Sequence, residues 1–296
     1  MDLIRSLLNV PADRPKMIEK APSYGADALI LDLEDAVAPA AKAEARIVAR
    51  EAVELSRDAA EGPPVYVRVN GLETGLLDAD LDAVVVAGLR GLQVPKVHGA
   101  ADVLALDARL SALEATRGLP TGSIELMVSL ESARGVHDAM AILSSASRVG
   151  AVMIGTAEDA DFQGDLGYLT TPDDIATLYA RSHVVLVARA IGTVHPVDGV
   201  FADVRDPNGL ERAALRARTL GYRAKKLIHP NQIEIVHRVF SPTEAELDRA
   251  RRIVEAMDAA FAEGRGTTTV DGRMVDVAMA ATARRLLGLD VTEGTA

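Results

Sequence analysis

The sequence predicts an α/β protein of the (β/α)8 TIM-barrel type, followed by a C-terminal helical extension that could act as a lid. Short apolar runs alternate with helical patterns along the chain, and this alternation is typical of repeated βα units. Eight such runs can be counted. The 296 residues also accommodate the roughly 250 that one barrel needs. Eight strands with crossover helices favour a closed barrel over an open sheet.

The eight expected strands lie near residues 4–9, 28–34, 65–70, 90–95, 124–130, 150–154, 193–197 and 225–229. Helical patterns separate them. In the segment 100–117, apolar residues recur at steps of three and four, namely Val103, Leu106, Leu110 and Leu113. A second helix is expected over 173–191, opened by Thr171 as the N-cap and Pro172 at the first helical position.

The pattern changes after His229-Pro230, so we assign residues 1–235 to the barrel and 236–296 to the extension. The segment 241–244 reads Ser-Pro-Thr-Glu, which predicts a helix start capped by Ser241 and a helix to about residue 263. Residues 264–272 are expected to be flexible or to form a hairpin, and a final helix is expected over 275–287. Such an appendage could close over the barrel.

Composition excludes several classes of protein. Hydrophobic residues make up 49% and charged residues 25%, and the formal net charge is −11, so neither nucleic acid nor an anionic membrane is an expected partner. There is no cysteine, which excludes disulfides and thiol nucleophiles. No apolar run approaches the ~20 residues that span a bilayer, and the first residues do not resemble a signal peptide. We expect a cytoplasmic protein.

Six of the apolar runs end in polar or charged residues. These ends are the acids of 32–35, Asn70, Lys96, Glu131, the acidic loop after Gly155, and His229. In a parallel barrel the C-terminal ends of the strands surround one mouth, where active sites are built. The pattern therefore predicts an enzyme. His229 is expected to have a structural hydrogen-bonding role.

Carboxylates follow two consecutive strands and predict a metal site. Glu131 ends one strand, and the loop after the next contains Glu158, Asp159 and Asp161. Carboxylates without a neighbouring His or Cys suit Mg²⁺, or Mn²⁺, with water completing the octahedron. The alternative is that these acids cap the following helices. The six His residues show no ligand spacing, so zinc is not expected.

Three acids end the second strand. Alternation places Asp32 and Glu34 on one side of the strand, so the three cannot all reach the mouth. We expect one to support the metal through water and another to pair with an arginine or cap a helix. Asp35 is the expected site residue.

Two cations also lie at strand ends. Arg68 stands in a strand otherwise suited to burial, so it must be paired or face an anion. It is either a substrate-binding residue that stabilises negative charge on an oxygen or part of a buried ion pair. Lys96 could in principle form a Schiff base, but the nearby acids favour a charged lysine.

The order and spacing of several motifs resemble the HpcH/HpaI aldolase superfamily, in particular the citrate lyase beta-subunit-like branch with malyl-CoA and citramalyl-CoA lyases. The resemblance covers nearly the whole chain. The motifs are Arg5-Ser6, Val10-Pro11, Lys20-Ala21, residues 31–37 with Lys42, Ala45 and Arg46, residues 68–70, 94–96, 131–135, 161–167 and 228–232.

The resemblance implies a barrel that binds Mg²⁺ through Glu131 and an Asp of the next loop. In relatives this loop is shorter. Here Asp161 keeps the spacing to the downstream Asp-Leu-Gly and Asp159 keeps a Glu-Asp pair, and we prefer Asp161. The resemblance gives Arg68 the stabilisation of a thioester enolate and counts Glu131 among the substrate-binding residues.

The resemblance also implies roles far from these acids. It places CoA near Arg5 and Lys20. It implies a homo-oligomer, a trimer or hexamer, in which Asp276 of one subunit serves a neighbour's barrel as a catalytic acid. Without the resemblance, Asp276 would be interpreted as a helix N-cap.

The implied activity is a Mg²⁺-dependent carbon–carbon lyase that cleaves or forms a 3-hydroxyacyl-CoA, releasing acetyl-CoA and a 2-oxo acid. One alternative is a hydrolase of malyl-CoA-type thioesters. Another is the beta subunit of a multi-enzyme citrate lyase with an acyl-carrier partner. The C-terminal segment with Asp276 favours a free-standing enzyme. A catalytically inactive binding module would lack a metal acid or Arg68, and both are present.

Overall fold

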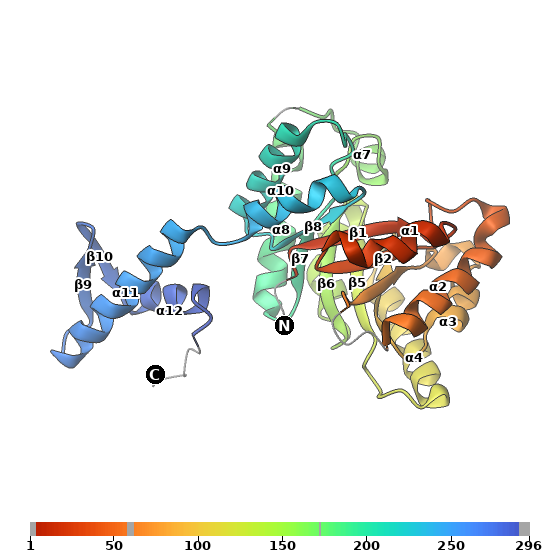
Figure 1. Ribbon diagram of the computed structural model, residues 1–296, viewed down its shortest axis with the longest axis horizontal. Helices are drawn as coiled ribbons and strands as arrows, with labels where there is room; N and C mark the ends of the chain where they lie inside the picture. Colours follow the sequence, from red (N-terminus) through yellow and green to blue (C-terminus); the bar gives the residue numbers. More distant parts are fainter. Residues whose placement is uncertain (1–3, 58–61, 172, 290–296) are drawn as a thin grey trace. The chain divides into compact units, whose positions relative to one another are not determined.

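The computed structural model describes residues 4–57, 62–171 and 173–289. They belong to two compact units, Met1–Phe240 and Ser241–Ala296. In the first unit the eight parallel strands pair in chain order and β8 pairs back with β1 (Figure 1), so the predicted (β/α)8 barrel is confirmed. The units divide five residues later than the expected 235, because helix α10 (Ile233–Phe240) packs on barrel helix α9 (Pro207–Leu220).

All eight expected strands are present, and their ends differ from the expected ends by no more than two residues. The strands are β1 Ser6–Pro11, β2 Ala28–Asp32, β3 Val65–Arg68, β4 Leu89–Val94, β5 Glu125–Leu130, β6 Val149–Ile154, β7 His195–Asp198 and β8 Ala224–Leu227.

The remaining barrel helices are α1 Pro15–Lys20, α2 Lys42–Arg57, α3 Leu77–Val84, α4 Ala100–Arg117, α5 Ala133–His137, α6 Ala139–Leu143, α7 Asp161–Leu166 and α8 Ile175–Ile191. Helix α4 has the predicted bounds, and the apolar stripe on it faces the core. Helix α8 begins later than predicted. Its N-cap position is Asp174, which has a left-handed φ of 53°, while the Thr171 hydroxyl donates to Asp173. Pro172 lies outside the described residues.

Alternation along the strands separates two cores. On β2, Ala28 and Ile30 belong to the apolar cluster inside the barrel, whereas Leu29 and Leu31 pack against the surrounding helices. The same phase continues to Asp32, which is why a charged side chain points into the barrel at the C-terminal end of the strand. The interior is thus mostly apolar near the N-terminal ends of the strands, where Glu125 and His195 are polar exceptions, and polar near the mouth. The buried polar residues inside include Asp32, Gln93, Ser129 and Lys226.

His195 begins β7 at the N-terminal end of the barrel and predicts a pH-dependent stability. Its Nε2 donates to the carbonyl of Ile4 at 3.1 Å. Burial, reinforced by Arg223, lowers the pKa of His195 from 6.5 to about 4. Between these values the unfolded chain binds more protons than the folded one, so the free energy of unfolding should rise with pH from 4 to 6.5, by up to about 3 kcal/mol.

Urea unfolding at about pH 4.5, 5.5 and 7 tests this prediction. His195→Gln should lose that increase. The matched control His137→Gln, in which an exposed side chain is replaced, should keep it. An identical pH dependence in His195→Gln and the unchanged protein would contradict the account of His195.

The second unit contains helix α11 (Glu244–Ala262), the hairpin of β9 (Thr267–Val270) and β10 (Arg273–Asp276), and helix α12 (Val277–Leu286). The expected cap at Ser241 is wrong. Thr243 caps α11, because its hydroxyl accepts from Glu246 N and the Glu246 carboxylate accepts from Thr243 N, a reciprocal capping box. The hairpin turns at Asp271-Gly272, both with positive φ.

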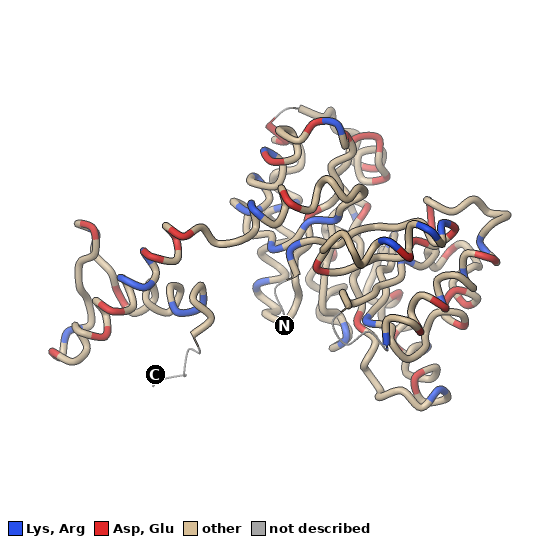
Figure 2. Tube along the Cα trace, in the orientation of Figure 1, with Lys and Arg blue, Asp and Glu red and all other residues tan. Residues whose placement is uncertain are grey.

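Helices α2 and α11 carry both basic and acidic residues (Figure 2), and some of these form ion pairs one helical turn apart, such as Arg50 with Glu54 and Arg252 with Asp248. Each pair of this kind contributes only about 0.3–0.5 kcal/mol. Within the described ranges, none of the helices combines the length and the apolar character needed to cross a membrane.

Candidate active site

A buried guanidinium–carboxylate pair lies at the C-terminal ends of β2 and β3. Nε and Nη2 of Arg68 donate to the two carboxylate oxygens of Asp32 at 2.8 and 2.5 Å. Asp32 is 0% exposed and also accepts from Asn9 Nδ2 at 3.0 Å and from the backbone N of Glu34 at 2.9 Å. Burial by itself raises the pKa of Asp32, but Arg68 outweighs burial and the pKa of Asp32 stays below its usual range. The charged carboxylate therefore fixes the planar guanidinium.

Glu34 and Asp35 follow in the loop after β2. Nη1 of Arg68 lies 2.6 Å from Glu34 Oε2 and 3.8 Å from Asp35 Oδ2. The contact with Glu34 lacks hydrogen-bond geometry, and no described residue donates a hydrogen bond to that buried oxygen. Burial, with Asp35 and Glu131 nearby, raises the pKa of Glu34 to about 7. The acid held against Arg68 is thus Glu34, while the expected Asp35 is 66% exposed at the edge.

Lys42 and Asn70 hold the loop that carries Glu34. Nζ of Lys42 donates to the carbonyls of Leu33 and Glu34 at 2.8 and 3.0 Å and to Asn70 Oδ1 at 2.8 Å. The Asn70 amide in turn donates to Asp80 at 2.6 Å. All three ammonium protons are therefore used, and two of them bind the backbone of the loop.

Lys96 bridges two acids at the mouth. It follows β4 with a φ of 54°, a left-handed conformation that is unusual for a residue other than glycine. Its Nζ lies 3.5 Å from Glu34 Oε1 and 3.3 Å from Asp161 Oδ2. Burial lowers the pKa of Lys96, but Glu34 and Asp161 outweigh burial and raise it. Lys96 is therefore a charged lysine, as predicted from the nearby acids.

Glu131 continues the interior face of β5 after Met127 and Ser129. Gly155, which follows β6, makes room for it, since a Cβ at this glycine would lie 3.3 Å from Glu131 Cγ. In the described part of the chain, no group donates a hydrogen bond to the Glu131 carboxylate. Burial raises its pKa, and the nearby Asp161 adds to this effect.

The two candidate aspartates of the next loop differ in their surroundings. Asp161 is the first residue of α7, and its carboxylate is exposed and bound to Lys96. Asp159 is also exposed, has a φ of 59°, and donates its backbone N–H to Gln163. The described residues contain no set of three His, Cys, Asp or Glu positioned for one metal ion, so Glu131, Asp159 and Asp161 are not brought together as a trio.

Glu131 and Asp161 nevertheless fit Mg²⁺ as a pair. Mg²⁺ is commonly held by one or two carboxylates and several waters. Glu131 has a half-buried carboxylate that accepts no hydrogen bond from any described side chain. The charge of Asp161 contributes to the raised pKa of Glu131. This donor set contains only hard oxygen atoms, which match the ion.

Arg5 and Lys20, the expected CoA-binding residues, are not part of this cluster. Arg5 precedes β1, at the opposite end of the barrel from the mouth, and binds Asp27 through Nε (3.0 Å) and Nη2 (2.8 Å). Lys20 is exposed in the last turn of α1, the helix that follows the C-terminal end of β1. His229 accepts from Asn231 N at 3.2 Å, which confirms its structural role.

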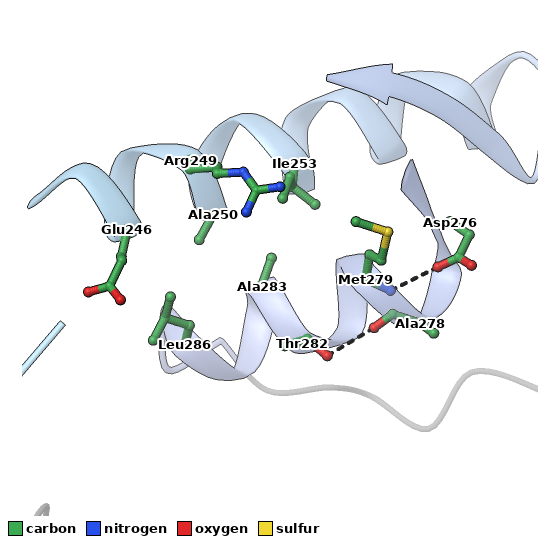
Figure 3. A pocket seen from close by; sticks show the side chains of 10 residues that line it. All are labelled: Glu246, Arg249, Ala250, Ile253, Asp276, Ala278, Met279, Thr282, Ala283 and Leu286. Carbon is green, nitrogen blue, oxygen red and sulfur yellow. Dashed lines mark hydrogen bonds between the residues drawn. The ribbon is translucent and has the colours of Figure 1, made fainter. Parts of the chain in front are cut away.

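Asp276 lies in the second unit. It ends β10 and caps α12, with Oδ1 accepting from Met279 N at 3.0 Å. Figure 3 shows it at one end of a groove of about 520 Å³ between α11 and α12. The lining residues are Glu246, Arg249, Ala250, Ile253, Asp276, Ala278, Met279, Thr282, Ala283 and Leu286. The N-cap interpretation is correct, and it leaves the second carboxylate oxygen available for other contacts.

Glu34 and Lys226 belong to this cluster but were not among the site residues predicted from the sequence. The period-two alternation already placed Glu34 on the same side as Asp32, and this signal could have selected it over Asp35. Lys226 on β8 is 4% exposed and donates to Gln93 Oε1 on β4 at 3.0 Å. The sequence of β8 has lysines at both 225 and 226, and it does not show which of the two side chains points into the barrel.

Comparisons with known proteins agree along most of the chain. The family model described as HpcH/HpaI aldolase/citrate lyase matches residues 5–230. Citrate lyase subunit beta of Leuconostoc mesenteroides subsp. cremoris is 36% identical over 289 residues, which cover 97% of this chain and 93% of that protein. The L-malyl-CoA/beta-methylmalyl-CoA lyase of Rhodobacter capsulatus is 36% identical over 297 residues, which cover 93% and 91%.

Among solved structures, CitE of Mycobacterium tuberculosis in complex with magnesium, acetoacetate and coenzyme A aligns with a TM-score of 0.77 and 31% identity. The alignment covers 97% of this chain and 98% of that chain. CitE in complex with magnesium and pyruvate aligns with a TM-score of 0.67 and 30% identity, over 82% of this chain and 92% of that chain.

Proposed function

This chain belongs to the HpcH/HpaI aldolase/citrate lyase family and is a CoA-ester lyase, and we propose that it cleaves or forms a 3-hydroxyacyl-CoA such as malyl-CoA or citramalyl-CoA with Mg²⁺. The products of cleavage are acetyl-CoA and a 2-oxo acid. One observation carries the proposal: Arg68, fixed by Asp32 and Glu34, shares the barrel mouth with Glu131 and Asp161.

We assign the metal to Glu131 and Asp161, with Mn²⁺ as an alternative ion. When bound, Mg²⁺ would polarise the substrate oxygens and lower the pKa of the hydroxyl group. The magnesium in the CitE structures supports this assignment.

Arg68 has the role of offsetting negative charge on the thioester oxygen. In the cleavage direction the 3-hydroxyl would pass its proton to the carboxylate of Asp276 from a neighbouring subunit, and its carbon becomes a carbonyl. The bond between C2 and C3 breaks, and the electron pair passes to the thioester enolate. A donor already oriented toward the oxygen where this charge develops stabilises the transition state without reorganisation.

The enolate then needs a proton at C2 to become acetyl-CoA. We assign this transfer to Asp276 of a neighbouring subunit in a homotrimer or hexamer, and we place CoA near Lys20. The position of Asp276 at the end of an open groove supports this role. Asp35, exposed at the edge of the mouth, is proposed as a second acid that substrate can reach.

Two alternatives keep the same residues. A hydrolase of malyl-CoA-type thioesters would direct water to the thioester. A subunit of a multi-enzyme citrate lyase would act on an acyl-carrier partner, and since the citrate lyase beta subunit aligns with 97% of this chain, an intact C-terminal segment does not separate the two. The barrel mouth favours neither of them over the free-standing lyase.

Product analysis separates these functions. Purified protein is incubated with malyl-CoA or citramalyl-CoA and Mg²⁺, and the CoA species are resolved by chromatography. The lyase should release acetyl-CoA and stoichiometric glyoxylate or pyruvate. Free CoA with malate or citramalate would identify the hydrolase, and no turnover of either thioester would contradict the proposed substrate class.

A further inference from the structure

Lys226 is a buried cation that the proposed reaction leaves without a role. Strand β8 contains two lysines that point in opposite directions. Lys225 faces outward, where its Nζ binds Asp198 at 2.5 Å and the carbonyl of Gly199 at 2.7 Å. Lys226 follows Ala224 on the inward face and is 4% exposed inside the barrel.

Lys226 reaches across the barrel interior to a single acceptor. Its Nζ donates to Gln93 Oε1 at 3.0 Å, and the Gln93 amide nitrogen donates to Ser129 Oγ at 2.9 Å and contacts Met153 Sδ at 3.8 Å. Lys226, Gln93 and Met153 come from β8, β4 and β6, as is typical of one interior layer of alternate strands. An ammonium group has three N–H donors, and the described residues supply one acceptor.

The acceptor of Lys226 stands beside Arg68, because Gln93 on β4 and Arg68 on β3 are register partners of neighbouring strands. Burial lowers the pKa of Lys226 to about 7, and Arg68 contributes to the decrease, whereas Asp32, Glu131 and Glu34 act in the opposite direction. Arg68 and the protonated form of Lys226 therefore repel each other while sharing the same carboxylates. A long apolar side chain would fill this position without the desolvation cost of an amine.

Because Gln93 is the register partner of Arg68 on the neighbouring strand, its Oε1 is the carbonyl oxygen that the guanidinium could reach by moving inward. It is a buried carbonyl oxygen, and Lys226 is its hydrogen-bond donor. If Lys226 were apolar, that acceptor would be unsatisfied, and the repulsion that opposes inward movement of the guanidinium would be absent. Arg68 could then exchange its contact with Glu34 for one with Gln93.

We propose that Lys226 is a positioning residue that keeps the Arg68 guanidinium at the barrel mouth, by occupying Gln93 Oε1 and excluding a second cation from the interior. The expected effect of Lys226 on turnover rests on the proposed function. Its expected effect on the position of the Arg68 guanidinium does not. Lys226 itself touches neither substrate nor metal in this account.

The test compares Lys226→Met, Lys226→Gln and the double variant Lys226→Met/Gln93→Met. Lys226→Met should fold, because replacing a buried charge with an apolar side chain of similar volume is often neutral or stabilising. Its kcat should fall by about 10–100-fold with KM changed less than about 2-fold, since a small displacement of a catalytic group costs this much. Lys226→Gln keeps a hydrogen-bond donor for Gln93 but not the charge, so its kcat should fall less than that of Lys226→Met. The double variant, which removes the alternative acceptor, should recover part of the rate.

A spectroscopic measurement reports on Arg68 without turnover. The Nε–Hε signal of Arg68 in ¹⁵N-labelled protein, assigned by its loss in Arg68→Lys, should shift in Lys226→Met and move back in the double variant. The signal of Arg90, which pairs with Glu125 near the N-terminal ends of the strands, serves as the internal control. A folded Lys226→Met with unchanged kcat and an unchanged Arg68 signal would overturn the inference, as would failure of both single variants to fold. An inactive wild-type protein would instead contradict the proposed function and leave the spectroscopic test valid.

Discussion

Arg68→Lys is expected to lower kcat by about 100–1000-fold while the protein remains folded. Arg68 donates to both oxygens of Asp32 and contacts Glu34 with its third nitrogen, and a lysine cannot reproduce this planar arrangement. The loss expected for one donor at a developing oxyanion is of this size. Steady-state kinetics with malyl-CoA or citramalyl-CoA measure the change.

The choice of lysine keeps the experiment interpretable. Arg68→Ala would leave the buried carboxylate of Asp32 without its counter-ion, which costs about 3–5 kcal/mol of stability and would confuse unfolding with lost catalysis. Arg90→Lys, a change of the same chemistry at a half-exposed ion pair, is the matched control and should leave kcat unchanged. Normal turnover in Arg68→Lys would remove Arg68 from the mechanism.

Glu131→Gln is expected to abolish metal binding and with it the lyase activity. Substitutions of residues that only support metal ligands typically cost 10–100-fold in affinity, so a direct ligand should cost at least about 100-fold. Titration calorimetry with Mg²⁺ and with Mn²⁺ in the absence of thioester measures this directly. Wild-type Mg²⁺ affinity in a folded Glu131→Gln protein would contradict the metal assignment.

The same titration separates the two aspartates of the α7 loop. Asp161→Asn should weaken Mg²⁺ binding strongly, because the Asp161 carboxylate binds Lys96 at the mouth and its charge contributes to the raised pKa of Glu131. Asp159→Asn should change it little, since the observed contact of Asp159 is made by its backbone. The reverse result would move the second ligand to Asp159.

The barrel was predictable because its signal is repeated eight times. Each strand is a short apolar run, and an error of two residues at an end does not change the count or the parallel order. Helix starts were less predictable. Ser241 with Glu244 and Thr243 with Glu246 have the same three-residue spacing, and the structure forms the reciprocal bonds at Thr243. At α8, a left-handed turn at Asp174 delays the helix beyond Thr171.

Candidate site residues at the end of a single strand were predictable from the sequence. Those whose position depends on contacts between neighbouring strands were less predictable. Glu131 and Arg68 could be selected from single strand ends. Alternation along β2 favoured Glu34 over Asp35, but the contact with the Arg68 guanidinium also depends on the register between β2 and β3. Arg5 was selected from a motif at the start of a strand, and that end of β1 lies at the other end of the barrel from the mouth.

The condensation direction shows in one experiment whether the protein forms the carbon–carbon bond and whether it needs a metal. Purified protein is given acetyl-CoA with glyoxylate or pyruvate, in the presence of Mg²⁺, with a chelator, and with Mg²⁺ restored in excess of the chelator. We expect malyl-CoA or citramalyl-CoA in the first and third mixtures and neither in the second. Condensation that persists with the chelator would contradict the role of the metal, and absence of both products in all three mixtures would contradict the lyase.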